Sequence, residues 1–341
     1  MEVFAHSPAP STRRDATLAR VTQTVQSQLD EVEKRIAQQA ATFDPAVEGY
    51  VTYAIGSRGK RLRPLLALLS GRATGAITSG HVDLAVIVEL IHIATLVHDD
   101  IIDEAERRRS QPTVNARWGN ALSVLLGDCL FAHALDLSTQ FDNPEVSRTI
   151  ARAARDVCSG EILQTQRRFD LHLAIDDYFR IIRMKTAALF GCACEIAALL
   201  NSTSAPLAAA LKQFGLRLGT AYQIYDDCVD LAGDERTIGK TLGTDLRKGK
   251  LTLPVLILLR AAPDAERERY CDLILNGGSE EIAQRLRTAA ADGPLTESIT
   301  RARVLVGEAE AQLEALPASA DKEPLNTLAG SIRDLLGRLS A

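Results

Sequence analysis

The chain has 341 residues, of which 46% are hydrophobic and only 4% are aromatic. This size and apolar content are enough for one large buried core or two smaller ones, and Ala and Leu dominate over the β-branched and aromatic residues that strands favour. The formal net charge of −5 excludes a general basic surface for nucleic acid or an anionic membrane. We therefore expect a globular, all-α protein in which any anionic ligand meets local clusters of cations.

Apolar residues recur every three or four positions through most of the chain, and alternation with a period of two never persists. We expect a mobile N-terminal tail over residues 1–17, followed by a single domain over residues 18–341. In chain order, the strongest predicted helices cover residues 16–41, 62–72, 82–102, 121–139, 146–166, 175–200 and 207–231, with shorter ones after residue 251.

Neither a secretion signal nor a transmembrane segment is expected. Residues 1–17 lack an apolar stretch, and the most apolar later run, residues 82–97, is interrupted by Asp83, Glu89 and His92. The six cysteines lack the paired spacing of a zinc site or of a disulfide framework, so we expect six reduced core thiols. These features predict a cytoplasmic protein.

An acidic cluster closes the third predicted helix. Asp99, Asp100 and Asp103 follow an almost continuous apolar run, and residues three and four apart share one face of a helix. Three acids near a helix C-terminus oppose the helix dipole, at about 0.3–1 kcal/mol each unless cations neutralise them. A solvated acidic face is the ordinary interpretation of one such cluster, but the preceding run is too apolar for a surface helix.

The same spacing occurs again in Asp226, Asp227 and Asp230, at the end of another apolar helix. If all six carboxylates faced one cavity they would repel each other strongly without metal, and Mg²⁺ typically joins a few carboxylates to substrate phosphates. The two clusters therefore predict a diphosphate bridged to the protein by Mg²⁺. Residues 232–250 combine glycines with Lys and Arg, which indicates a flexible cationic loop that can close over phosphate.

Over residues 59–254 the chain resembles the trans-isoprenyl diphosphate synthase (polyprenyl synthetase) family. The similarity lies in GKRLRP at 59–64, His92, DDIID at 99–103, Arg108 and Arg109, GEILQ at 160–164, KTA at 185–187, Gln223, DDCVD at 226–230, Gly239 with Lys240, and Gly249 with Lys250. One departure is Ser110, where the family usually has Gly after the paired arginines.

The resemblance implies the isoprenoid synthase fold, a single large helical bundle around a deep central cavity. It implies that the two aspartate clusters hold Mg²⁺ on an allylic diphosphate. Direct contacts to the same diphosphate are implied for the cations Arg108, Lys185, Lys240 and Lys250. A separate, metal-free pocket for isopentenyl diphosphate is implied for Gly59, Lys60, Arg63, His92 and Arg109. The polar atoms of Thr186 and Gln223 would stabilise the allylic cation.

The implied reaction is the Mg²⁺-dependent, head-to-tail condensation of isopentenyl diphosphate with an allylic diphosphate. Family members are usually homodimers, and the helix over residues 121–139 would supply the interface. A class I terpene cyclase is the nearest alternative, but it has no use for the basic segment 59–64 or for a second full aspartate cluster. A non-catalytic subunit of a heteromeric prenyltransferase is another, and it would be expected to have lost some of these residues.

Product length is expected to depend on the helix before Asp99. Ala94 and Thr95 lie one turn before that residue, where family members that stop at farnesyl carry bulky aromatics. Because both residues are small here, the floor should lie deeper, at Ile91, at Ile87 or on residues 187–199. This predicts an all-trans product of hexaprenyl to decaprenyl length, with geranylgeranyl as the alternative.

Overall fold

The computed structural model describes residues 19–56, 59–108, 111–232, 243–276, 280–291, 293–317 and 320–339. The predicted tail over 1–17 and the candidate residues Arg109 and Lys240 lie outside this set. The elements are α2 (Gln26–Gln39), η1 (Ala40–Thr42), α3 (Pro45–Ile55), α4 (Leu62–Thr74), α5 (Ser79–Ile102), β1 (Arg107–Arg108), β2 (Gln111–Pro112), α6 (Val114–Trp118), α7 (Asn120–Ser138), α8 (Pro144–Gln166), α9 (Ile175–Ile182), η2 (Arg183–Ala187), α10 (Ala188–Leu200), α11 (Ala205–Ala232), α13 (Thr244–Arg247), α14 (Leu253–Ala261), α15 (Asp264–Asn276), α16 (Glu280–Ala291), α17 (Gly293–Gln312), η3 (Leu313–Ala315), η4 (Ala320–Lys322) and α18 (Glu323–Arg338).

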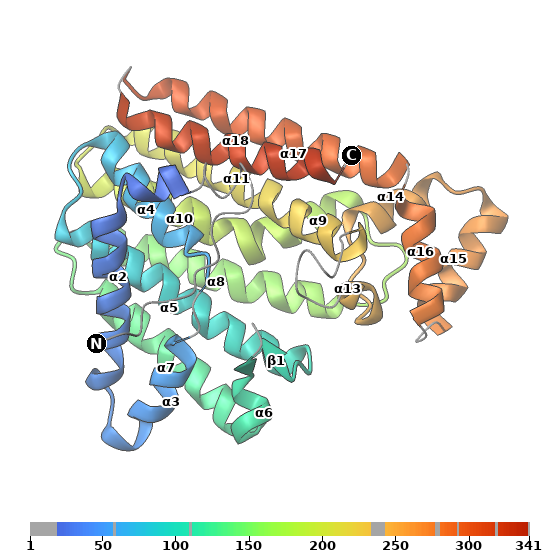
Figure 1. Cartoon of the computed structure of the whole chain (residues 1–341), viewed down its shortest axis with the longest axis horizontal. Helices are drawn as coiled ribbons and strands as arrows, with labels where there is room; N and C mark the ends of the chain where they lie inside the picture. The colour runs from blue at the N-terminus through green and yellow to red at the C-terminus, as the bar shows by residue number, and fades with distance from the viewer. Residues whose placement is uncertain are drawn as a thin grey trace.

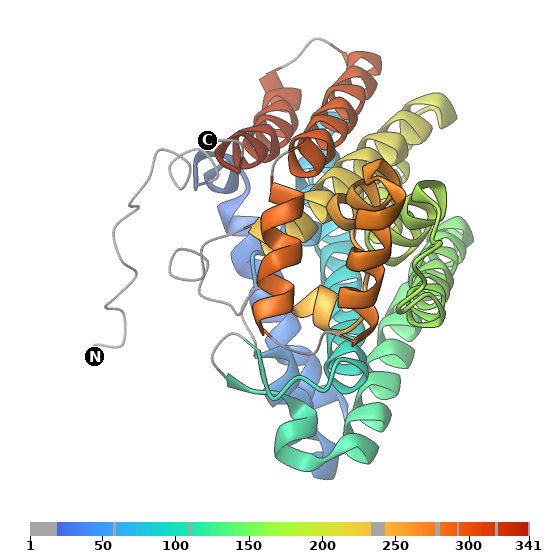
Figure 2. The same ribbon diagram turned by 90° about the vertical axis from the view of Figure 1, so that its right-hand side faces the viewer.

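The all-α prediction is confirmed, and the core is organised around α10. This helix packs against α4, α5, α8 and α11, and α11 in turn packs against α17. The long helices run side by side along the molecule, with α17 and α18 on one edge and α15 and α16 at one end (Figure 1). The end-on view in Figure 2 shows the same helices as a bundle.

Helix α5 carries the first acidic cluster, and its burial follows from its sequence. It begins with a capping box between Thr78 and His81 and is buried along most of its length. By length and composition α5 and α7 could each cross a membrane, but 72% of the most apolar part of α5 is buried, as in the core helix of a globular bundle, against 33% for α7. Helix α7 therefore exposes much of its apolar surface.

Two local features differ from the prediction. The single helix expected over residues 175–200 is divided by a π-helical turn, η2, which carries Lys185 and Thr186. Such turns often occur at functional sites, because the wider turn changes where its side chains point. A short antiparallel hairpin also follows α5, in which Arg107 pairs with Pro112 and Arg108 with Gln111.

The thiols are all free, and Cys192, Cys194 and Cys228 are buried as expected. Cys129 and Cys158 are exposed, so the expectation of six core thiols is wrong for these two.

Close helix contacts fix the position of η2. A Cβ atom added at Gly160 of α8 would lie 2.5 Å from the backbone nitrogen of Lys185, and one added at Gly219 of α11 would lie 2.9 Å from the Cα atom of Ala187. Real Cβ atoms do not approach backbone this closely. The two glycines therefore let α8 and α11 pack directly against the turn that carries Lys185.

We predict that Gly160→Ala lowers the free energy of unfolding by about 1–3 kcal/mol, because the added methyl group forces the backbones apart. Gly307→Ala in α17 is the matched control: no atom lies within 4 Å of the added Cβ. It should be neutral or stabilising by up to about 1 kcal/mol, since Ala is the better helix former. Chemical denaturation of both variants measures the difference, and equal stabilities would contradict the proposed contact.

Candidate active site

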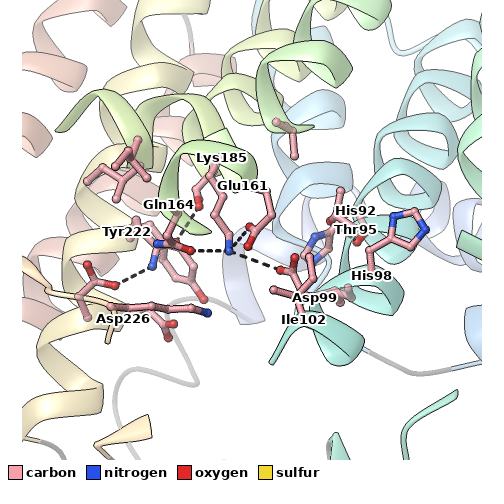
Figure 3. A pocket seen from close by; sticks show the side chains of 18 of the residues that line it. His92, Thr95, His98, Asp99, Ile102, Glu161, Gln164, Lys185, Tyr222 and Asp226 are labelled. Carbon is pink, nitrogen blue, oxygen red and sulfur yellow. Dashed lines mark hydrogen bonds and ion pairs between the residues drawn. The ribbon is translucent and has the colours of Figure 1, made fainter. Parts of the chain in front are cut away.

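A cavity of about 750 Å³ lies between α5, α8, η2 and α11, which is large enough for a small-molecule ligand. Its wall has a polar part and an apolar part. The polar part includes Lys60, Arg63, Glu89, His92, Asp99, Arg108, Glu161, Gln164, Lys185, Gln223, Asp226, Asp227, Asp245 and Lys250. Figure 3 shows Asp99 and Asp226 on opposite sides of Lys185.

Lys185 joins α8 to the first acidic cluster. Its Nζ atom donates a hydrogen bond to Gln164 Oε1 (2.8 Å), forms an ion pair with Glu161, and lies 3.7 Å from Asp99 Oδ2. Burial raises the pKa of Asp99, and the charge of Lys185 opposes that rise. Burial favours neutral Lys185, but the charges of Asp99 and Glu161 outweigh it and raise the pKa of Lys185. The lysine is therefore a buried cation.

Asp103 is surrounded by cations from other elements. Its carboxylate accepts hydrogen bonds from Arg168 Nη2 and Lys250 Nζ, each at 2.8 Å, and Lys248 Nζ lies 3.6 Å away. Burial would raise the pKa of Asp103, but the hydrogen bond and charge of Lys250 hold it below the usual value. Asp103 is thus ionised and neutralised by neighbouring side chains.

Asp100 faces the hairpin. Its Oδ1 atom accepts hydrogen bonds from Arg108 Nε at 2.9 Å and Nη2 at 2.8 Å. Burial raises the pKa of Asp100, and Arg108 partly opposes this. Arg108 also lines the cavity, so the pair connects the first acidic cluster to the cavity wall.

The expectation that all six carboxylates face one cavity is met in neither cluster, and in the first cluster only Asp99 lines the cavity. Asp226 and Asp227 line the cavity, whereas Asp230 does not. Asp230 accepts hydrogen bonds from the backbone nitrogen atoms of Thr244 and Asp245 and from the Thr244 hydroxyl. It therefore holds the start of α13, where Gly243 has a positive φ of 69°.

Asp227 is fully engaged with neighbouring side chains. It accepts hydrogen bonds from the Tyr178 hydroxyl (2.6 Å) and from Gln223 Nε2 (2.8 Å). The Oε1 atom of Gln223 accepts one from the Thr186 hydroxyl (2.7 Å). Burial, followed by the negative charge of Asp245, raises the pKa of Asp227. Asp226 is the other member of this cluster that lines the cavity.

The donor chemistry fits a hard divalent cation. Within the described ranges, no three His, Cys, Asp or Glu side chains converge into a ready-made metal site. Carboxylates nevertheless stand at both sides of one cavity, and Mg²⁺ commonly takes one or two carboxylates together with substrate phosphates and water. Asp99 on α5 and Asp226 on α11 line the cavity and could hold it, together with Asp103, which follows α5 and is not itself among the lining residues.

The basic segment before α4 lines another part of the wall. Gly59, Lys60, Arg63 and His92 meet there. The guanidinium group of Arg63 lies 4.9 Å from the centre of the Phe190 ring, and its buried Nε atom has no hydrogen-bond partner among the described residues. Burial lowers the pKa of Arg63. An anion reaching this side would satisfy an unpaired buried donor.

The residues expected to set product length lie in two different environments in the structure. Thr95 lines the cavity, together with Leu96, Phe131 and Val157. Ala94 and Ile91 are fully buried and are not among the lining residues. Thr95 thus lies on the cavity wall, and the expectation that Ala94 and Ile91 limit the growing chain stays a prediction.

Sequence reasoning missed several residues that line the cavity or contact the acidic clusters. Glu161 belongs to the segment 160–164 that resembles the family, so the sequence did indicate that this residue is important. No sequence pattern indicated Arg168 or Tyr178. Their contacts with Asp103 and Asp227 join residues that are 65 and 49 positions apart in the chain.

The comparisons with known proteins agree with this geometry. Residues 44–289 match the family model described as polyprenyl synthetase. The chain is 34% identical over 278 residues to the octaprenyl diphosphate synthase of Escherichia coli, which covers 81% of this chain and 86% of that protein. It is 35% identical over 277 residues to heptaprenyl diphosphate synthase component 2 of Geobacillus stearothermophilus, covering 81% and 84%.

Solved structures are also similar. A polyprenyl synthase from Caulobacter crescentus, crystallised with calcium and isoprenyl diphosphate, superposes with a TM-score of 0.86 at 33% identity. The match covers 93% of this chain and 97% of that one. Because the family model spans most of the chain and the fold agrees over nearly all of it, the chain belongs to the polyprenyl synthetase family of prenyltransferases, with the all-helical isoprenoid synthase fold.

Proposed function

We propose that the protein is a magnesium-dependent trans-polyprenyl diphosphate synthase, which adds isopentenyl diphosphate to an allylic diphosphate and makes a product longer than farnesyl. The observation that carries this proposal is one cavity with three parts. Asp99 and Asp226 stand at opposite sides, Lys185 lies between them, and the basic segment 59–63 forms a further wall. Two anionic substrates in one cavity need such separate sites.

The allylic diphosphate would lie between α5 and α11. Bound Mg²⁺, held by Asp99, Asp103 and Asp226, would supply the positive charge that stabilises the departing diphosphate. The side chains of Arg108, Lys185 and Lys250 line the same cavity and add fixed cations around the phosphate oxygens. The oxygens of Thr186 and Gln223 face the allylic carbon atoms without a strong nucleophile among them.

Isopentenyl diphosphate would bind beside Lys60, Arg63 and His92. Arg63 supplies planar donors and Lys60 a point charge, so a diphosphate can be held there without metal. Its double bond then attacks the allylic cation, and the proton lost from the new chain passes to the released diphosphate. Arg109 and Lys240 lie outside the described residues and are kept as proposed ligands.

A non-catalytic role in a two-component enzyme is the second candidate function, because one similar protein is named component 2 of a heptaprenyl synthase. All candidate residues for both pockets are present in this chain. The two functions are separated by incubating the purified chain alone with Mg²⁺, isopentenyl diphosphate and farnesyl diphosphate. Prenyl chain growth supports the proposal, and activity only after adding a second protein supports the alternative.

We predict that Asp99→Asn and Asp226→Asn each lower kcat by about 10²-fold or more, because each removes a negative charge that holds the metal. Chelation of Mg²⁺ should abolish turnover. Asp83→Asn is the control, since Asp83 lies at the other end of α5 and pairs with Arg35. Steady-state kinetics of the three variants measure the effect, and near-normal activity of either cavity variant would refute the role of that cluster.

The proposed product length rests on the apolar part of the cavity. Thr95 is small and lies one helical turn from Asp99 on the wall, so a growing chain can pass it. Leu96, Phe131 and Val157 add apolar side chains to the wall of the same cavity. We therefore propose hexaprenyl to decaprenyl products, with geranylgeranyl as the runner-up if Phe131 stops the chain early.

Thr95→Phe should shorten the product towards farnesyl while catalysis continues, because the ring fills the passage and leaves the carboxylates unchanged. Ala94→Phe is the matched variant. Since Ala94 is fully buried, its ring overpacks the core and is expected to cost about 1–3 kcal/mol of stability. Chromatography of the products and thermal unfolding separate the two effects. A folded Thr95→Phe enzyme with unchanged product length would contradict this passage.

We also propose that the protein works as a homodimer in the cytoplasm, with α7 and α8 at the interface. Leu125 on α7 and Ile162 on α8 are exposed by 62% and 59%, which is unusual for large apolar side chains. Asp128 and Asp136 stand on the exposed part of α7, and the exposed part of α8 carries three arginines, Arg148, Arg152 and Arg155. A two-fold arrangement can therefore join opposite charges around an apolar centre.

Leu125→Arg should convert the dimer to a monomer at micromolar concentration, because it buries a charge in the apolar centre. The control is Val304→Arg on α17, which replaces another exposed apolar residue (56% exposed) away from α7. Light scattering gives the mass of each variant. A wild-type monomer, or a Leu125→Arg dimer as stable as the wild type, would rule out this interface.

A further inference from the structure

Arg61 begins α4 in a backbone conformation that a long side chain rarely adopts. Its φ is 48° and its ψ is 37°, in the left-handed region, and it is followed directly by the first turn of α4. Lys60 comes immediately before this left-handed residue and Arg63 two residues after it. Such a conformation persists only where the surrounding contacts fix it.

Two carboxylates from different helices hold the Arg61 side chain. Its Nε and Nη2 atoms donate to the two oxygens of Glu33 on α2, at 2.5 and 3.2 Å. Its Nη1 atom donates to Glu89 Oε1 on α5 at 2.6 Å. The Arg61 and Glu89 side chains are only 9% and 4% exposed. Burial lowers the pKa of Arg61, but the bonds to both glutamates raise it overall, so the guanidinium stays charged.

The hydrogen-bond donors of Arg61 are satisfied by protein carboxylates, whereas the Nε atom of Arg63 has no partner among the described residues. Two nitrogen atoms of the Arg61 guanidinium bind both oxygens of Glu33, and the third binds Glu89. The hydrogen bonds of Arg61 therefore go to α2 and α5. Arg63 has a buried Nε atom without a partner and lies beside the same Glu89. The two arginines of this segment therefore have different tasks.

We infer that Arg61 is a positioning residue: its clamp between Glu33 of α2 and Glu89 of α5 fixes the left-handed turn that aims Lys60 and Arg63 into the cavity. This inference rests on the proposed isopentenyl diphosphate pocket. It assigns α2, which supplies none of the described cavity-lining residues, a part in the affinity for that substrate. Glu33 acts through Arg61 and never touches the substrate.

The sign of the Glu33 effect distinguishes positioning from direct binding. Removing a carboxylate near an anionic site should strengthen anion binding by simple charge, and would free Arg61 if that residue itself bound the diphosphate. Loss of positioning acts in the opposite direction. A raised KM for isopentenyl diphosphate in Glu33→Ala therefore has no electrostatic explanation.

The test compares Glu33→Ala with Glu31→Ala by steady-state kinetics. Glu31 lies on the same helix and pairs with Arg35 and Lys34, away from the cavity. Glu33→Ala is expected to raise the KM for isopentenyl diphosphate about tenfold, with kcat and the allylic KM changed less than twofold. Glu33→Gln, which keeps one acceptor oxygen, should give an intermediate KM and also serves if the alanine variant does not fold. Glu31→Ala should match the wild type.

Arg63→Ala is measured in parallel so that the pocket and the clamp can fail separately. If Arg63→Ala raises the KM for isopentenyl diphosphate selectively and Glu33→Ala leaves it unchanged or lower, the clamp is overturned and the pocket stands. If Arg63→Ala changes the KM values of both substrates equally, the pocket is wrongly assigned. The inference about Arg61, which rests on that pocket, is then overturned as well. A further reduction of affinity by Glu33→Ala in an Arg61→Ala background would also overturn the clamp, because Glu33 would then act without Arg61.

Discussion

The arrangement of the site depends on one constraint: carboxylates lie at two sides of one cavity, and their negative charges must be neutralised. Asp99 lines the cavity near the end of α5, Asp226 lines it from α11, and burial raises the pKa of Asp99. In the structure Lys185 lies near Asp99, and Arg168 and Lys250 bind Asp103. The charges of Lys185 and Lys250 lower the pKa values of Asp99 and Asp103 and so favour their ionised forms. Lys185 and Lys250 also line the cavity, so under the proposed function these two cations would meet the bound diphosphate.

The helical bundle holds these charges at fixed distances. Gly160 and Gly219 let α8 and α11 approach the π-helical turn, and this turn puts Lys185 between the two acidic helices. Asp230 contributes from outside the cavity, because its bonds to the first residues of α13 anchor the end of α11 to the segment that leads to Lys250. Part of the acidic motif is thus structural support for the part that faces the ligand.

The sequence was sufficient for the positions of the main helices and of the two acidic clusters. Helical periodicity placed α5, α7, α8 and α11 within a few residues, and the repeated aspartate spacing identified both acidic clusters. Periodicity could not reveal the π-helical turn, because a single wider turn hardly changes the apolar pattern. Spacing alone also could not tell that Asp230 turns towards α13, nor that Ala94 faces the core while Thr95 faces the cavity. These outcomes depend on how neighbouring helices pack around each residue.

The central claim is that one diphosphate is held between the two acidic helices by divalent metal. The most direct measurement is a crystal structure of the protein soaked with Mn²⁺ and an unreactive allylic thiodiphosphate, with the metal located by anomalous scattering. The account predicts metal peaks bonded to Asp99 or Asp103 on one side and to Asp226 on the other, with the diphosphate between them and Lys185 in contact with its oxygens. Metal bound at only one cluster, or a diphosphate bound outside this gap, would contradict it.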